Sequence, residues 1–142
     1  MARRIEQFQS VIDNWKRKDI DAVLASMSEG IVWHFAAAAE PPLVGKTAAR
    51  KFLVRFGADI AEIRWRIIHH AETENRLFVE GVDEYVTPAG VTISAPYAGV
   101  IEFDGDFISA WRDYVDVGVM RAQRNGEPIT SQVTQLAQRP SI

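Results

Sequence analysis

Two aspartates interrupt the apolar faces of two predicted strands, Asp83 in the segment 77–85 and Asp113 in the segment 107–116. Because the side chains of a strand alternate between its two faces, neither carboxyl group can turn outward without its whole strand turning over. Burial raises the pKa of a carboxyl group, which prepares it to act as a general acid or base near neutral pH. The two positions therefore predict acid–base chemistry in a pocket. The capping of a turn or a helix end is the structural alternative for each aspartate.

Tyr97 is predicted to lie between the two acids. A three-residue turn between the strand of Asp83 and the next strand sets Asp83 opposite Ala95. A similar turn before the last strand sets Asp113 opposite Tyr97. Since neighbouring strands lie about 4.8 Å apart, two carboxyl groups and a phenol in this arrangement can address one ligand. Asp113, Asp83 and Tyr97 are thus the predicted catalytic residues.

The elements that must position these groups are N-terminal helices and an antiparallel meander. Helical spacing of apolar residues predicts three helices, over 5–15, 20–27 and 49–56, and Gly57 is expected to end the third. An alternating pattern predicts strands over 31–35, 63–70, 77–85, 91–103 and 107–116. A short helix at 117–124 follows, and Asp116 either faces outward at the end of the last strand or caps this helix. This order predicts an α+β fold in which a cone-shaped curved sheet wraps the helices, and the mouth of the cone is a natural small-ligand pocket.

Length, charge and cysteine content limit the classes of protein to which the chain can belong. The 142 residues are 47% hydrophobic, which predicts a single domain, 1–142, with a core of 1–125 and a polar tail of 126–142. The tail could close over the mouth, pack on a partner or be disordered. The net charge is −3 and the basic residues are scattered, so no nucleic-acid partner is expected. No apolar run approaches the roughly 20 residues that span a bilayer, and no secretory signal is recognised, so no membrane partner is expected. The chain has no cysteine, which excludes disulfides and thiol catalysis, and a cytoplasmic protein is expected.

The predicted pocket is mostly aromatic. Its substrate-binding residues are expected to be Trp15, Trp33, Phe35, Phe56, Gly81, Tyr85, Trp111, Val115 and Met120. Core packing is the alternative for each aromatic ring. Strand alternation turns His34 away from the pocket and puts His69 on the face of Trp65, as a core or interface histidine. The adjacent His69 and His70 point to opposite faces and cannot chelate one metal ion. We expect no metal and no cofactor.

Together these features resemble the limonene-1,2-epoxide hydrolase branch of the SnoaL-like, nuclear transport factor 2-like superfamily. The likeness runs through the segments VWHF (32–35), VGKTAARKFL (44–53) and GVDEY (81–85), and it is most specific in WRDYVD (111–116). The resemblance implies the same curved-sheet cone, chemistry without a cofactor, and a homodimer formed through the outer face of the sheet.

The resemblance also implies roles for the two acids. The family's general base matches Asp113, and the acid that protonates its epoxide oxygen matches Asp83. Gly81 stands where the family has an arginine between the acids, so open space is expected beside it. Without that arginine the two carboxyl groups would share a proton. Trp33 and Phe35 stand where the family holds its water with a tyrosine and an asparagine.

A pocket without a water site favours proton transfer over hydrolysis. We therefore predict a cofactor-independent acid–base enzyme of the isomerase, cyclase or lyase type. Its substrate is small and hydrophobic, of aromatic, terpenoid or polyketide-like kind. Asp113 is the base, and Asp83 or Tyr97 is the acid or oxyanion donor. The alternatives are an epoxide hydrolase of the limonene-1,2-epoxide hydrolase type and a non-catalytic protein that binds a hydrophobic ligand.

Overall fold

A computed structural model describes residues 3–142 of the chain. Its helices are α1 (Arg4–Lys16), α2 (Ile20–Ala25), α3 (Lys46–Ala58), α4 (Val117–Arg124) and α5 (Ser131–Ala137). Its strands are β1 (Met27–His34), β2 (Leu43–Val44), β3 (Glu62–Ile63), β4 (Arg66–Glu72), β5 (Arg76–Val86), β6 (Thr92–Asp104) and β7 (Phe107–Val115). None of these helices combines the length and the apolar character that a membrane crossing requires.

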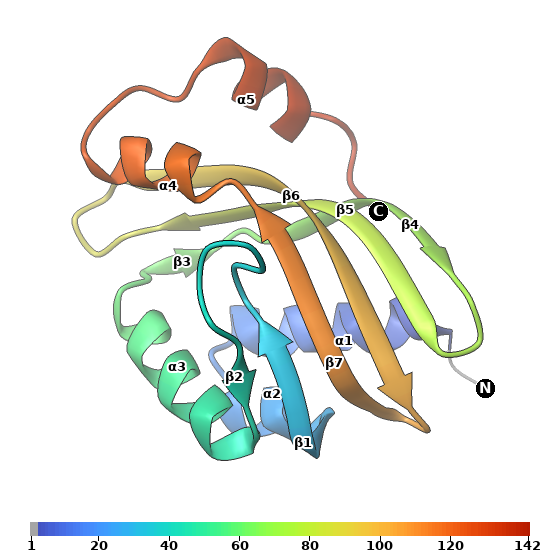
Figure 1. The fold of residues 1–142 in the computed structure, drawn as a ribbon. Helices are drawn as coiled ribbons and strands as arrows, with labels where there is room; N and C mark the ends of the chain where they lie inside the picture. The colour runs from blue at the N-terminus through green and yellow to red at the C-terminus, as the bar shows by residue number, and fades with distance from the viewer. Residues whose placement is uncertain (1–2) are drawn as a thin grey trace.

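One curled sheet forms the body of the molecule. Its strands lie in the order β2-β1-β7-β6-β5-β3, and β4 pairs with the N-terminal part of β5. The β1–β7 pair is parallel and the other pairs are antiparallel. Figure 1 shows the sheet curling over α1 and α3, while α5 lies on its opposite, outer side. The predicted α+β fold, a curved sheet around N-terminal helices, is confirmed.

The N-terminal helices bury the apolar stripes that predict them. Phe8 and Ile12 of α1 are fully buried against the sheet. Between α1 and α2, Lys18 adopts a left-handed backbone conformation with a φ of 55°. Its ammonium group donates to the carbonyl oxygens of Gly57 and Ile60. These hydrogen bonds connect the α1–α2 turn to the C-terminal end of α3. They hold in place the helices that pack against the concave side of the sheet.

The register of the central strands agrees with the prediction on one side of β6 and differs on the other. Asp83 of β5 lies opposite Ala95, as predicted. Asp113 of β7 lies opposite Gly99 and not, as predicted, opposite Tyr97. Both aspartates still point to the concave side, because the shift in register amounts to an even number of residues.

A tighter turn and a bulge cause the difference. Asp104 pairs with Phe107 across a two-residue turn, and Ser109 is then left without a partner on β6. Before the bulge, the side chains of β7 therefore point to the side opposite to the one that simple alternation from Trp111 predicts. Ile108 is buried and Phe107 is half exposed. Beyond the bulge, Trp111 keeps its predicted inward face.

Two predicted element ends are wrong for local reasons. Gly57 lies inside α3, which continues to Ala58, and does not end the helix. A Cβ atom at Gly57 would lie 3.3 Å from the indole of Trp15, so the glycine admits that ring against the helix. Met27, expected at the end of the second helix, instead begins β1.

The predicted position of His69 is also wrong. The register of β4 shifts between Ile67 and His69, so that Ile67 and Ile68 are both buried. His69 is thereby turned to the surface, where its Nδ1 lies 3.0 Å from a carboxylate oxygen of Glu80. It belongs neither to the core nor to the pocket.

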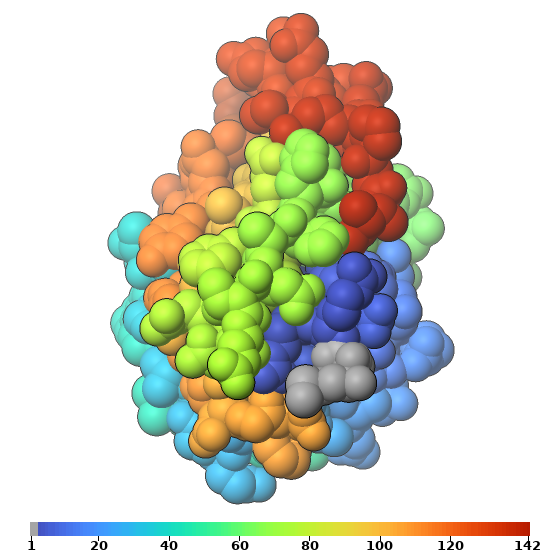
Figure 2. Space-filling view, turned by 90° about the vertical axis from the view of Figure 1, so that its right-hand side faces the viewer, coloured from blue at the N-terminus to red at the C-terminus, as the bar shows by residue number. Residues whose placement is uncertain are grey.

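Residues 126–142 fold back over the outer face of the sheet and not over the pocket. Arg139 forms a bidentate ion pair with Glu80, with N–O distances of 3.1 and 3.0 Å. The backbone N–H of Ile142 donates to the carbonyl oxygen of Ile67 (3.0 Å). Figure 2 shows this C-terminal segment (red) lying beside β4 (green) at the edge of the sheet. The tail therefore occupies part of the face through which the resemblance implies a homodimer.

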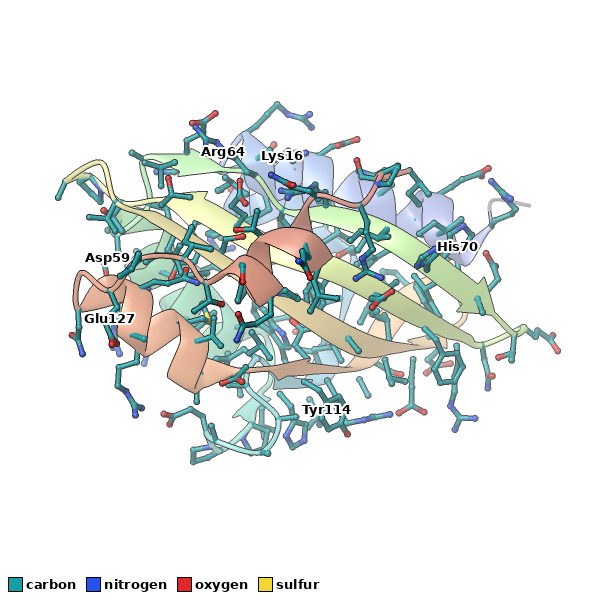
Figure 3. All side chains as sticks on the ribbon, turned by 90° about the horizontal axis from the view of Figure 1, so that it is seen from above. Lys16, Asp59, Arg64, His70, Tyr114 and Glu127 are labelled. Atoms are coloured by element: carbon teal, nitrogen blue, oxygen red, sulfur yellow. The ribbon has the colours of Figure 1, made fainter. Side chains whose placement is uncertain are left out.

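Other parts of the outer face are open. Figure 3 looks down on this side, with α5 crossing the strands, His70 to the right of this helix and Tyr114 below it. Tyr114 is 52% exposed, and its neighbour Arg112 pairs with Glu102 at 2.6 Å. Arg112 and Tyr114 point away from the concave side, as alternation from Asp113 requires.

Candidate active site

The curled sheet, α1, α3 and α4 enclose a cavity of about 410 Å³. Ligand pockets of small molecules span roughly 300–1,000 Å³, so this volume suits one small ligand. Apolar and aromatic side chains form most of the lining. The side chains that carry polar groups other than indoles are Glu40, Asp83, Tyr85, Tyr97, Asp113, Arg121 and Arg124. The fold thus brings both predicted acids, from β5 and β7, to one cavity.

Asp113 is held by a neighbour on its own strand. Its Oδ1 accepts a hydrogen bond from Nε1 of Trp111 (2.9 Å). The carboxyl group lies over Gly99, where a Cβ atom would stand 2.8 Å from Oδ1, so only glycine leaves it room. Burial raises the pKa of Asp113 well above its ordinary 3.8, the Trp111 hydrogen bond opposes the rise, and the charge of Asp83 adds to it. Asp113 therefore keeps its proton at pH values at which an exposed aspartate is ionised.

Asp83 lies in a different charge environment. Burial raises the pKa of Asp83 from 3.8 to about 6, and the positive charge of Arg124 limits this rise. Because the positive charge of Arg124 acts on Asp83, and no cation of residues 3–142 acts on Asp113 in the same way, Asp83 loses its proton first. Over the pH range between the two ionisations, the pair carries one proton and one negative charge.

Tyr97 lines the cavity close to both acids. Its hydroxyl oxygen accepts a hydrogen bond from Nε1 of Trp65 (2.6 Å), which leaves its own O–H available to donate. Burial and the charges of Asp113 and Asp83 raise the pKa of Tyr97 well above 10, and the hydrogen bond from Trp65 opposes them. The phenol is therefore a neutral hydrogen-bond donor in the cavity.

Stacked rings form the walls around these groups. The indole of Trp111 stacks on that of Trp33 with ring centroids 4.9 Å apart, and on that of Trp65 at 5.9 Å. Phe35 stacks on Phe52 at 4.3 Å. Such walls present flat apolar surfaces to a ligand and leave few groups that could hold water beside the acids.

All the predicted site residues except Gly81 line the cavity. The prediction of open space beside Gly81 is wrong. A Cβ atom there would lie 2.5 Å from the carbonyl oxygen of Arg66 and 3.0 Å from the ring of Tyr97. The glycine lets β4 pass close to β5 beside the bulge in β4. The same contacts leave no space for the arginine that the resemblance expects at this position.

Two arginines of α4 are absent from the prediction. Val117, Met120, Arg121 and Arg124 all line the cavity, and only Met120 is among the predicted residues. Arg124 donates a hydrogen bond to the hydroxyl group of Tyr85. Helical spacing is the signal that finds these arginines, because Arg124 lies four residues after Met120 and Arg121 lies four residues after Val117. A cation thus reaches Asp83 from a helix and not from the neighbouring position on its strand.

Two further cavity residues, Phe52 and Trp65, are also absent from the prediction. Their apolar periodicity does not distinguish a residue of the core from a residue of a cavity wall. Within residues 3–142, no cluster of three histidine, aspartate or glutamate side chains is arranged to hold a metal ion.

A family model of the SnoaL-like domain matches residues 8–111 of the chain. The chain belongs to the SnoaL-like domain family. The matched region of this SnoaL-like protein includes Asp83 and Tyr97 and ends at Trp111, two residues before the second acid. Helix α4 with its arginines also lies beyond the match. No curated protein sequence matches the chain.

Solved structures share the fold of this SnoaL-like protein. A candidate SnoaL-like polyketide cyclase from Shewanella denitrificans has a TM-score of 0.78 at 18% identity, over 88% of this chain and 100% of that chain. A candidate polyketide cyclase from Xanthomonas campestris has a TM-score of 0.74 at 22% identity, over 84% and 94%. An epoxide hydrolase from M. tuberculosis, similar to limonene-epoxide hydrolase, has a TM-score of 0.71 at 20% identity, over 84% and 86%. At these identities the likeness shows a common fold.

Proposed function

We propose that this SnoaL-like protein is a cofactor-independent acid–base enzyme that moves a proton on a small hydrophobic substrate of aromatic, terpenoid or polyketide-like kind. The observation that carries the proposal is the pair of carboxyl groups, Asp83 and Asp113, in one largely apolar cavity. Their pKa values are both raised, yet within residues 3–142 a positive charge, that of Arg124, opposes the rise for Asp83 and none does so for Asp113. Two acids whose environments separate their ionisations are the usual arrangement for an acid and a base in one site. The candidate polyketide cyclases with this fold support the same kind of chemistry.

The charges around the two acids favour roles opposite to those that the resemblance implies. Near neutral pH, Asp83 is the ionised member, because its pKa is about 6. Asp113 enters the reaction protonated, since burial without a cation holds its pKa higher. We therefore propose Asp83 as the proton acceptor, with Asp113 and Tyr97 as donors to the oxygen on which charge develops. Asp113 as the base, the role implied by the resemblance, stays a prediction that the experiment below tests against this one.

The proposed step is proton abstraction beside a carbonyl group. The carboxylate of Asp83 takes a proton from the carbon next to the carbonyl. The electron pair of that C–H bond forms a C=C bond, and the π pair of the carbonyl moves to its oxygen. Hydrogen bonds from Tyr97 and protonated Asp113 stabilise the resulting enolate. In an isomerisation, Asp83 returns the proton to another carbon of the conjugated enolate. In a cyclisation, the enolate carbon attacks a second carbonyl carbon of the same molecule, and the oxygen of that carbonyl takes the proton from Asp83. In an elimination, the β-hydroxyl group leaves as water with that proton.

The packing of β1 supports proton transfer over epoxide hydrolysis. Trp33 packs edge-on against Phe52 at 5.2 Å and stacks on Trp111, and Phe35 stacks on Phe52. These rings occupy the two positions at which the resemblance expects groups that hold a water. Hydrolysis needs a water that is placed to attack carbon, whereas enolisation needs none.

The proposal can be tested without knowing the natural substrate. The protein is incubated in D₂O with a panel of aromatic ketones, β,γ-enones, β-hydroxy ketones and epoxides, and proton NMR follows both deuterium uptake and product formation. We expect deuterium to enter the carbon next to the carbonyl. Asp83→Asn is expected to lower this rate by about 10²- to 10⁴-fold, the usual contribution of a general base. Asp113→Asn keeps an N–H donor and is expected to lose less than the roughly 10²-fold that follows removal of an oxyanion donor.

The matched control is Asp104→Asn, which neutralises an exposed aspartate at the β6–β7 turn and should leave the rate unchanged. A larger loss for Asp113→Asn than for Asp83→Asn would restore Asp113 as the base. Wild-type rates in both variants would show that the pair does not perform the chemistry. Diol formation from an epoxide would identify a hydrolase. Tight binding of a ligand with neither exchange nor product would identify a binding protein.

A further inference from the structure

One face of α4 changes from apolar to cationic along the helix. Val117, Met120, Arg121 and Arg124 are spaced i, i+3, i+4 and i+7, so they share one helix face, and all four line the cavity. The first two are partly buried, whereas the side chains of the two arginines reach the surface. The arginines therefore lie where the cavity opens to solvent, next to its apolar interior. We call the exposed residues that line this opening the rim.

Both arginines are available to bind a ligand. Neither Arg121 nor Arg124 has a carboxylate in ion-pair range among residues 3–142, whereas seven arginines elsewhere in the chain do. Arg124 is already oriented, because it donates to the hydroxyl group of Tyr85 and its guanidinium carbon lies 5.5 Å from the centre of that ring. A guanidinium group carries five N–H donors, so most donors of both arginines are free.

The other charges at the cavity leave the rim positive. Glu40, on the loop after β1, is the exposed acidic residue that lines the cavity, and the charge of Asp59 at the end of α3 also acts on Tyr85. Among the exposed residues that line the cavity, two arginines and one glutamate leave one net positive charge. Asp83 and Asp113 lie on strands β5 and β7 of the sheet, so a ligand that spans the cavity can keep an anionic end at α4 and a reacting carbon at the acids.

We infer that the substrate carries a carboxylate, which Arg121 and Arg124 bind at the rim while the ring system of the substrate fills the aromatic interior. The planar guanidinium group matches the two oxygens of a carboxylate, and the hydrogen-bonded position of Arg124 reduces the entropy lost on binding. This inference rests on the proposed function, because it names the class of substrate for that same cavity: aromatic or polyketide-like carboxylic acids rather than neutral hydrocarbons or esters.

The test is calorimetric titration with two probes of the same shape, 2-naphthoate and the neutral 2-naphthamide. We expect the wild-type protein to bind 2-naphthoate more tightly than 2-naphthamide, with a preference that falls as salt is added. Arg121→Gln and Arg124→Gln should each weaken 2-naphthoate binding by about threefold to tenfold and leave 2-naphthamide binding nearly unchanged. The double variant should bind both probes equally. Arg55→Gln removes an exposed arginine of α3 that does not line the cavity, and should change neither Kd.

Equal binding of the two probes by the wild-type protein would overturn the inference, and so would a preference for 2-naphthoate that survives in the double variant. Failure of both probes to bind would also overturn it. The proposed function fails separately: it is wrong if carbonyl substrates bind but exchange no deuterium, whatever the charge preference. A melting temperature like that of the wild type for each glutamine variant ensures that a lost preference reflects lost contacts at the rim.

Discussion

The raised pKa of Asp83 predicts that this aspartate lowers the stability of the fold at neutral pH. In the unfolded chain the carboxyl group ionises near 3.8, and in the folded protein at about 6. For a group whose pKa is raised on folding, ionisation is easier in the unfolded state, so the free energy of unfolding falls as pH rises between the two values. Asp83→Asn removes the ionisation while keeping the shape of the side chain, and should therefore stabilise the protein above this range.

The magnitude follows from the difference between the two pKa values. A difference of about 2.2 units, at 1.36 kcal/mol per unit, amounts to about 3 kcal/mol. The gain from Asp83→Asn should approach this figure at about pH 8 and fall below about 1 kcal/mol at about pH 4, where the native and unfolded states are both largely protonated. Water in the open cavity screens the charge, so about 3 kcal/mol is the upper bound.

Urea unfolding of the wild type and of Asp83→Asn across this pH range measures the effect. The control Asp104→Asn, at the exposed β6–β7 turn, should show no such gain. Equal stability of Asp83→Asn and wild type at the alkaline end would refute the reasoning, because the buried charge would then cost nothing. A gain that is the same at both ends of the range would also refute it, because it would come from packing and not from ionisation.

Three further substitutions test single contacts. Gly81→Ala brings a Cβ atom to within 2.5 Å of the carbonyl oxygen of Arg66 and should destabilise the protein by about 1–3 kcal/mol in thermal unfolding. Trp111→Phe removes the N–H that bonds to Asp113, a contact that lowers the pKa of this carboxyl group, so the limb of the pH–rate profile due to Asp113 should move to higher pH. Asp116→Ala removes the side chain that caps α4 and should cost about 1 kcal/mol, with faster amide exchange in the first turn of that helix.

Each of these three predictions has an outcome that would contradict it. Gly30→Ala has open space around the new Cβ atom and should be tolerated, so equal losses at Gly30 and Gly81 would contradict the steric argument. An unmoved pH profile in Trp111→Phe would show that the indole does not control Asp113. Unchanged exchange at the backbone N–H groups of Gly118 and Val119, which the Asp116 carboxylate accepts from, would show that α4 needs no cap.

The sequence determined which side chains face the cavity wherever local rules suffice. Strand alternation turns Asp83, Tyr97 and Asp113 to the concave side, because a strand with one buried face cannot rotate a single residue outward. The three-residue loop after Thr87 sets Asp83 opposite Ala95, because a short turn fixes the pairing of the strands that it joins. In the same way a carboxylate just before a helix predicts a cap, as Asp116 is for α4.

Only the tertiary structure decided the features that depend on contacts between distant segments. The two-residue turn and the bulge at Ser109 together set Asp113 opposite Gly99. Alternation cannot reveal this change, because a register shift of two residues leaves Asp113 on the same face. The crowding at Gly81 comes from β4 and from the ring of Tyr97 on β6, not from its own strand. The positive charge of Arg124, on a helix about forty residues further along the chain, acts on Asp83, and this charge determines which acid ionises first. Periodicity reports which side of its own element a residue faces, whereas the charge that a residue meets there depends on the packing of other elements.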